Sequence, residues 1–139
     1  METLIWNESL SVSCAEVDND HKKLVTLLNN LITAINENRE REVVGRVLDE
    51  MLSYTSWHFR HEERLMQTYR YEGFTNHKNE HAELIGHASN LRRQFHEEGA
   101  GITQEVIDFL KKWLTHHILE TDMHMGHFLN QKMGANTKA

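Results

Sequence analysis

The 139-residue chain contains no proline and a single cysteine. Without proline, the commonest breaker of helices is missing, and we expect an all-α fold with few irregular connections. The one thiol, Cys14, excludes an intramolecular disulfide and is typical of a reducing compartment. We assign Cys14 no chemical role.

The sequence also lacks long apolar runs and an excess of positive charge. No apolar stretch approaches the ~20 residues that span a bilayer, and residues 1–10 lack the basic and apolar regions of a signal peptide. A formal net charge of −6 argues against nonspecific nucleic-acid binding, which uses a basic face. With 39% apolar and 26% charged residues, we expect one cytoplasmic globular domain, monomeric by default, with no membrane span and no nucleic-acid partner.

Histidine, in contrast, is abundant, with 11 residues. Two patterns stand close together, because His58 precedes Glu62 by four residues and His77 precedes His81 by four. Residues four apart lie on one face of an α-helix, so each pair directs two donor groups at one spot. A short turn containing Gly73 would fold the two helices into a hairpin. Three imidazoles and a carboxylate would then share an interior where polar groups are costly unless bonded, which predicts half of a metal site.

Hydrophobic periodicity predicts four helices joined by short turns. An extended N-terminal arm, residues 1–17, is expected to cross the bundle with Trp6 as its anchor. The side chains of Asp18 and Asp20 would cap the first helix. The four helices form a bundle over residues 18–132. They are expected from the capping residues 18–20 to about 36, at about 41–67 and 75–97, and after an N-cap at Thr103, and a polar tail follows at 133–139. Such elements build an up-down-up-down antiparallel four-helix bundle, an architecture that holds metal sites in its core.

Polar residues interrupt the apolar faces of these helices. His21 takes the first core position of the first helix, where by itself it would more often be a core or capping histidine. His58 and Glu62 interrupt the second helix at consecutive turns, and a buried glutamate is rare unless it is paired or ligating. Eight other polar side chains fall off the inward faces or beyond the main helix, near a frayed end, and are expected at the surface: Arg60, His61, Glu63, Arg64, His87, His96, His124 and His127.

The fourth helix leaves two ligand pairs open. His116 and Glu120 form a regular pair four residues apart. His117 and Asp122 are five residues apart, which is about 140° around an ideal helix. The heptad step from Leu110 favours His117 as the inward histidine, and a local π-type widening would bring Asp122 to the same centre. Spacing alone divides the choice almost evenly.

The inward donors suit two metal ions better than one. When the pair His117 and Asp122 is taken, they comprise five histidines and two carboxylates: His21, His58, His77, His81, His117, Glu62 and Asp122. A tetrahedral zinc site would use about four ligands, whereas imidazoles with bridging carboxylates favour iron or manganese. With a bridging oxygen, this set fills about eleven of the twelve positions of two octahedral metals. The remaining position suits a small ligand such as O2.

These segments together resemble the hemerythrin family, specifically its single-domain bacterial type. The matching segments lie between residues 6 and 122: Trp6 in the arm, VDNDHKKL at 17–24, HFRHEERLM at 58–66, HKNEH at 77–81 and WLTHHILETD at 113–122. The resemblance favours His117 and Asp122 in the fourth helix, because the family pattern is His-x4-Asp.

The resemblance also implies the cofactor and the ligand pocket. Two iron ions would be bridged by Glu62, Asp122 and an oxo or hydroxo group. One iron would be held by His77, His81 and His117 and the other, with the open position for O2, by His21 and His58. Apolar side chains near these ligands would form a dry pocket for O2, with Leu114 as its gate: Leu24, Phe59, Trp113, Leu114 and Ile118.

The expected function is therefore reversible O2 binding, for carriage, storage or delivery, and not enzymatic turnover. Carboxylate-rich di-iron enzymes use four or more carboxylates, whereas this chain offers mostly neutral imidazoles and no evident acid in the pocket. The alternative is a di-iron redox enzyme or a sensor acting on O2, peroxide or NO. A sensing or delivery role would require a separate client protein.

Overall fold

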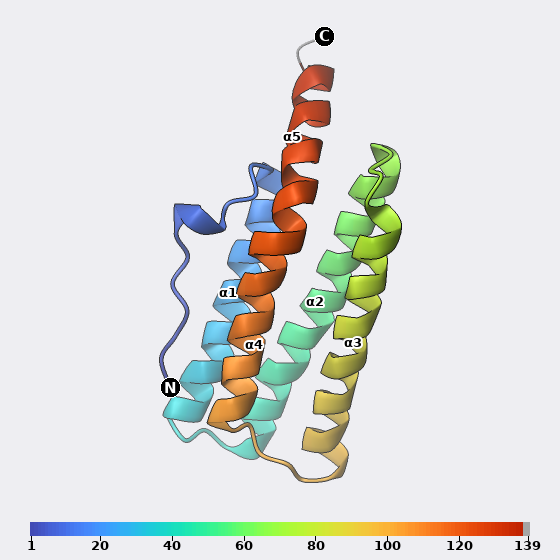
Figure 1. Ribbon diagram of the computed structural model, residues 1–139. Coiled ribbons are helices and arrows are strands. Elements are labelled where there is room, and N and C mark those ends of the chain that lie inside the picture. Colours follow the sequence, from blue (N-terminus) through green and yellow to red (C-terminus); the bar gives the residue numbers. More distant parts are fainter. Residues whose placement is uncertain (138–139) are drawn as a thin grey trace.

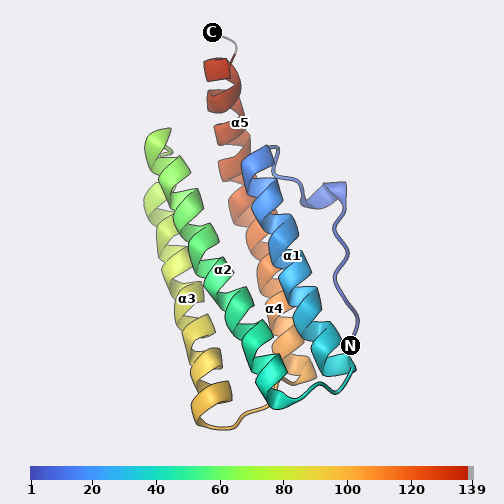
Figure 2. The ribbon, with the colours of Figure 1, turned by 180° about the vertical axis from the view of Figure 1, so that it is seen from behind.

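Four long helices run up and down around a common core in the computed structural model, which describes the backbone of residues 1–137 and the side chains of 1–133 (Figures 1 and 2). They are α1 (Ala15–Asn36), α2 (Arg41–Thr68), α3 (Phe74–Glu97) and α4 (Gln104–His116). A π-helical turn, η2 (His117–Asp122), joins α4 to α5 (Met123–Thr137). The prediction of an all-α, antiparallel four-helix bundle is confirmed.

The start of α1 differs from the prediction. The helix begins at Ala15, before the residues that were expected to cap it, with Cys14 in the N-cap position. Asp18 does not cap this helix, because its carboxylate accepts hydrogen bonds from the Val12 amide (2.8 Å) and the Ser11 hydroxyl (2.6 Å). The predicted cap was wrong because this carboxylate fastens the arm that precedes the helix.

The N-terminal arm lies along the outside of α1, as Figure 1 shows. It is not extended throughout, because a 3-10 turn, η1 (Glu8–Leu10), interrupts it. The amide and carbonyl of Leu4 both bond the side chain of Asn29, at 2.8 and 2.7 Å. Trp6 is only half-buried against the core, whereas Leu10 and Val12 are buried. The arm is thus held at several points and not by Trp6 alone.

The C-terminal segment is helical and not a separate polar tail. α5 continues the line of α4 and rises beyond the end of the bundle (Figure 1). Met125 and Leu129 are fully buried, and Met133 packs against the core from one turn further on. α5 runs to Thr137 and so continues into the segment predicted as a polar tail, 133–139, of which residues 138–139 lie outside the described part. His124 and His127 are exposed, as predicted, but on an ordered helix.

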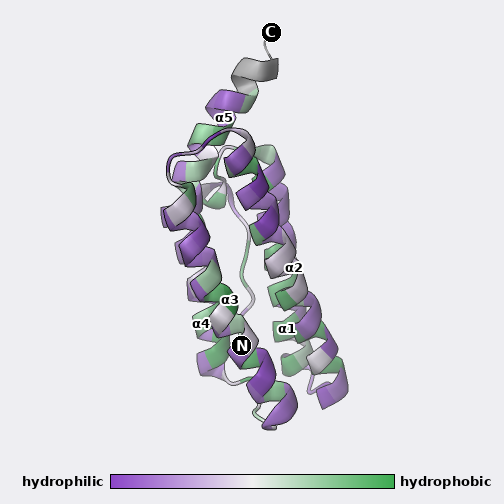
Figure 3. Cartoon of the chain, turned by 90° about the vertical axis from the view of Figure 1, so that its right-hand side faces the viewer, coloured by the Kyte–Doolittle hydropathy of each residue, from purple (hydrophilic) through white to green (hydrophobic). Residues whose placement is uncertain are grey.

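Hydrophilic and hydrophobic residues alternate along the helices, as expected for amphipathic helices (Figure 3). α3 has the smallest buried fraction of the four long helices, since only three of its 24 residues are buried: His77, His81 and Phe95. Two leucines on the same helix, Leu84 and Leu91, are half-buried. In the described residues, no helix is long and apolar enough to cross a membrane.

The contact between the arm and α5 yields a stability prediction. A β-carbon added at Gly126 would collide with the Val12 carbonyl oxygen and lie 2.6 Å from the Val12 β-carbon. We expect Gly126→Ala to lower the free energy of unfolding by about 1–3 kcal/mol through this overpacking. Gly86→Ala is the matched control, because nothing lies within 4 Å of its added β-carbon. The control should gain up to about 1 kcal/mol from helix propensity. Chemical denaturation measures the free energy of unfolding of both variants, and an equal change in the two would contradict the predicted collision at Gly126.

Candidate metal centre

All seven predicted ligands meet in the middle of the bundle. They come from three helices and the π-helical turn: α1 gives His21, α2 gives His58 and Glu62, α3 gives His77 and His81, and η2 gives His117 and Asp122. Each is at most 3% exposed. The apolar periodicity of each helix brings them there, because each ligand occupies an inward position of its helix.

The donor atoms form two groups that share Glu62 and Asp122. On one side, His21 Nε2 lies 2.9 Å from Asp122 Oδ2, and His58 Nε2 lies 3.0 Å from Glu62 Oε2. On the other side, the opposite oxygens of the same carboxylates face the remaining histidines. Asp122 Oδ1 lies 2.9 Å from His77 Nε2, and Glu62 Oε1 lies 2.9 Å from His81 Nε2. Each carboxylate therefore presents one oxygen to each group.

These short distances do not correspond to hydrogen bonds. All four carboxylate oxygens are buried without a hydrogen-bond partner among the described residues, and so are the five Nε2 atoms. The separations agree with hydrogen bonding, but the angles do not, and the angles are the stricter criterion for a directional bond. Ligands at right angles on a metal with bonds of about 2.1 Å would lie about 3 Å apart. The donor set therefore fits two neighbouring cations.

A second set of carboxylates orients three of the imidazoles from outside. Nδ1 of His58 lies 2.9 Å from Asp20, that of His81 lies 2.9 Å from Glu63, and that of His117 lies 2.7 Å from Glu80. A hydrogen bond at Nδ1 leaves Nε2 free to ligate and increases its basicity. Glu80 also accepts hydrogen bonds from the Thr121 hydroxyl, at 2.8 and 2.9 Å.

The sequence analysis missed this outer set. Asp20 was assigned to a helix cap and Glu63 to solvent, and both assignments are wrong. A signal was present, because Asp20, Glu63 and Glu80 each adjoin a ligand in the sequence. One residue along a helix is a rotation of about 100°, which turns such a side chain toward the neighbouring helix.

His61 also belongs to the outer set, contrary to its predicted place at the surface. Its Nδ1 lies 2.5 Å from the same Asp20 oxygen that His58 contacts, and its side chain is 19% exposed. Its ring lies against Trp57, with centroids 5.2 Å apart. Arg60, Arg64, His87 and His96 are exposed, as predicted.

The π-helical turn decides between the two pairs left open in the fourth helix. In a π turn the hydrogen bond joins residues five apart, and here the Met123 amide bonds the Ile118 carbonyl. His117 and Asp122 thereby point to the same centre. His116 and Glu120 pair with each other at 3.2 Å on the outside, with side chains 61% and 67% exposed.

The residues predicted to line an O2 pocket are buried or half-buried. Leu24, Leu114 and Ile118 are buried, and Trp113 is half-buried. Phe59 stacks on His81 with ring centroids 3.9 Å apart and lies 5.9 Å from His58, so it touches both histidine groups.

The electrostatics of the cluster favour protonated histidines and ionised carboxylates. Burial lowers the pKa of His58, but the charge of Glu62 and the hydrogen bond with Asp20 outweigh it and raise that pKa to about 10. Burial also opposes protonation of His77, whose contacts with Asp122 and Glu62 nevertheless raise its pKa to about 9. For Glu62 itself, burial raises the pKa, but the charge of His58 and contacts with other histidines hold it well below its usual value. The cluster thus attracts positive charge, whether protons or metal ions.

Comparisons with known proteins agree with this geometry. The hemerythrin HHE cation binding domain, as a family model, matches residues 14–129. The chain is 35% identical to a bacteriohemerythrin of Methylococcus capsulatus, across 88% of this chain and 93% of that protein. It is 30% identical to myohemerythrin-1 of Phascolopsis gouldii, across 87% and 90%. A crystal structure of wild-type hemerythrin has a TM-score of 0.85 and 31% identity, covering 93% of this chain and 99% of that one.

The raised histidine pKa values predict proton release on metal binding. At pH 7 the metal-free cluster holds protons on His58 and His77, whose pKa values are about 10 and 9. Burial lowers the pKa values of His21 and His117, but contacts with Asp122 outweigh it and raise them as well. A metal ligand must be a neutral imidazole, so loading should expel at least about two protons per chain. Affinity should therefore increase from pH 7 toward pH 9 and level off above pH 10. Calorimetric titration with Zn²⁺ in two buffers of different ionisation enthalpy counts the protons, and a count of zero would contradict the charge state inferred here.

Proposed function

The chain belongs to the hemerythrin family, and we propose that it binds O2 reversibly at two iron ions, for carriage, storage or delivery. One observation carries the proposal. Glu62 and Asp122 each present one oxygen to His21 and His58 and the other oxygen to His77, His81 and His117. Carboxylates placed in this way bridge two metals, and imidazole with bridging carboxylate favours iron.

The proposed ligands form two groups, one for each iron ion. His77, His81 and His117 would hold one iron, and His21 and His58 would hold the other. Glu62 and Asp122 would be ligands of both ions. When bound, the iron pair supplies two electrons and a free coordination position on the two-histidine side.

The protein's own side chains keep this centre rigid and dry. Asp20, Glu63 and Glu80 fix three imidazole rings through their Nδ1 atoms. The proposed O2 pocket is formed by apolar side chains that exclude water: Leu24, Phe59, Trp113, Leu114 and Ile118. None of these five can donate a proton from a titratable group, which favours holding O2 over cleaving it.

Other features remain predictions. The absence of enzymatic turnover agrees with the oxygen-binding character of the family. We infer a cytoplasmic location, a monomer and a separate client from sequence considerations only. The alternative, a redox enzyme or sensor acting on O2, peroxide or NO, differs in its products and not in its ligand set.

The deciding measurement is iron content together with optical spectra before air, after air and after O2 removal. We expect about two irons per chain and a visible band that appears with O2 and fades when O2 is removed. Glu62→Ala should lose the paired site, because both ions depend on this carboxylate. Glu120→Ala is the matched control, since Glu120 is exposed and faces away from the centre. Oxidation that cannot be reversed by removing O2 would favour the enzyme or sensor, and full iron in Glu62→Ala would overturn the bridge.

Leu114 is the proposed gate of the O2 pocket. It is 3% exposed and lies one turn before His117. Leu114→Ala should admit water and accelerate autoxidation of the oxygenated protein several-fold, while costing about 2–5 kcal/mol of stability. Leu119→Ala is the control, because Leu119 is 44% exposed. The decay of the visible band at a temperature where both variants are folded measures the rates, and equal rates would exclude Leu114 from the gate.

A further inference from the structure

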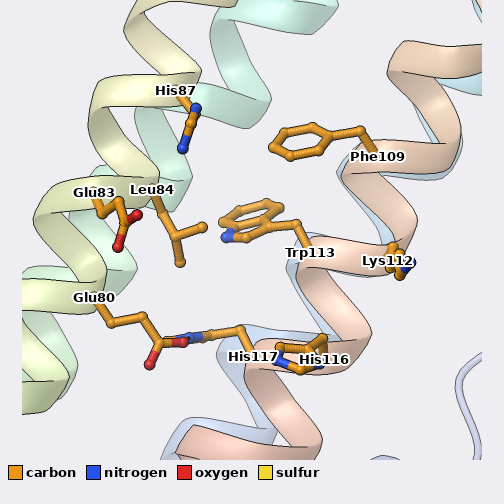
Figure 4. Close-up of a pocket in the computed structure, with 9 residues that line it drawn as sticks. All are labelled: Glu80, Glu83, Leu84, His87, Phe109, Lys112, Trp113, His116 and His117. Carbon is orange, nitrogen blue, oxygen red and sulfur yellow. Dashed lines mark hydrogen bonds and ion pairs between the residues drawn. The ribbon is translucent and has the colours of Figure 1, made fainter.

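A pocket of about 350 Å³ opens between α3 and α4, and it shares Trp113 with the proposed O2 pocket (Figure 4). Its volume lies within the range of small-molecule sites, about 300–1,000 Å³. Leu84, Phe109 and Trp113 supply its apolar walls, and Glu80 and Glu83 border it on α3. The hollow exists because α3 is only half-buried along this seam and Phe109 is 47% exposed.

The walls suit a flat, aromatic ring. Figure 4 shows the rings of Phe109 and Trp113 both projecting from α4 toward α3. The ring of His87 reaches across from α3 to lie 6.0 Å from that of Phe109, edge to face. Aromatic rings prefer such edge-to-face and offset contacts with one another.

The polar groups suit a neutral hydroxyl. The indole nitrogen of Trp113 is buried, has no hydrogen-bond partner within the described chain, and is turned toward Leu84 at the inner wall (Figure 4). A buried donor of this kind costs free energy until an acceptor reaches it. A hydroxyl can accept from the indole N–H while it donates to a carboxylate. The exposed charges of Glu83 and Lys112 oppose each other in sign. The charge of Glu80 is partly compensated by its contacts with His117 and Thr121, although its oxygens can accept a further hydrogen bond, so the pocket does not favour an ion.

Glu80 connects this pocket to the metal centre. Its carboxylate lines the pocket and also lies 2.7 Å from Nδ1 of His117. A ligand hydroxyl that donates to Glu80 weakens its pull on the His117 N–H. Less basic ligands leave a metal poorer in electrons, and binding of O2 draws electrons from the metal pair.

We propose that this pocket binds a small, neutral aromatic alcohol of the phenol class and that its occupancy lowers the affinity of the centre for O2. The binding step stands on the pocket alone. The effect on O2 rests on the proposed function.

Binding is tested on the zinc-loaded protein, so that neither iron nor O2 is involved. 4-Methylphenol is titrated while NMR follows the indole N–H signals of the three tryptophans, with Trp113 assigned through Trp113→Phe. We expect a saturable shift confined to Trp113, whereas Trp6 and Trp57 stay unchanged. Leu84→Trp should fill the hollow and abolish the shift, and Ala82→Trp, an exposed position on the same helix, should retain it.

A milder variant and two other ligands test the binding of 4-methylphenol further. Because Phe109 is exposed, Phe109→Ala should leave the fold intact. It should weaken binding of 4-methylphenol roughly three- to tenfold, because it removes one aromatic wall of the pocket. Toluene, which lacks the hydroxyl, should bind more weakly, and tetramethylammonium should not compete. No saturable shift with 4-methylphenol, or tighter binding of the cation, overturns the proposal.

The effect on O2 is measured separately by O2 titration of the iron-loaded protein with and without saturating 4-methylphenol. We expect a severalfold lower O2 affinity with the phenol, and no change in Leu84→Trp. Binding without this change overturns the coupling while the site stands. A protein that binds the phenol but never binds O2 reversibly contradicts the proposed function and not the pocket.

Discussion

Four carboxylate oxygens, those of Glu62 and Asp122, are buried in the middle of the bundle without a hydrogen-bond donor among the described residues. Removing an ionised carboxylate from water costs several kcal/mol unless opposite charge compensates it. The surrounding histidines answer this constraint by directing five Nε2 atoms at the same oxygens. Two shared metal ions would satisfy all of these atoms together. The rest of the site is arranged around that requirement.

Negative charge returns at the outer edge of the cluster. Asp20, Glu63 and Glu80 bond the far sides of three imidazoles, and each retains some contact with solvent, with side chains 8%, 21% and 35% exposed. Partial hydration lowers the cost of keeping these groups ionised, while their hydrogen bonds fix the ring orientations. The centre is thus enclosed by apolar side chains and oriented by carboxylates that lie nearer the surface. Glu80 has the most solvent contact of the three, and it is the one beside the pocket between α3 and α4.

α3 shows how the site contributes to the fold. Its only buried residues in the described chain are His77, His81 and Phe95, so two of its three buried side chains are proposed metal ligands. Apolar burial, which holds α1 and α2 together, is scarce on this helix. Metal binding to His77 and His81 would therefore supply attachment that leucines supply elsewhere, since binding free energy of a metal is also folding free energy.

The sequence alone determined the helices, their antiparallel order and the inward positions of His21, His58, Glu62, His77 and His81, because these depend on local periodicity. It could not choose between His116–Glu120 and His117–Asp122 by spacing, since a π turn is a small change in backbone hydrogen bonding that no local pattern demands. The tertiary structure decided that choice, and it also decided the partners of Asp18, Asp20, His61 and Glu63. Those side chains lie beside the buried face of their helix, where a residue can contact solvent, the end of its own helix or a neighbouring helix. Only the packing of one helix against the next determines which of these it meets.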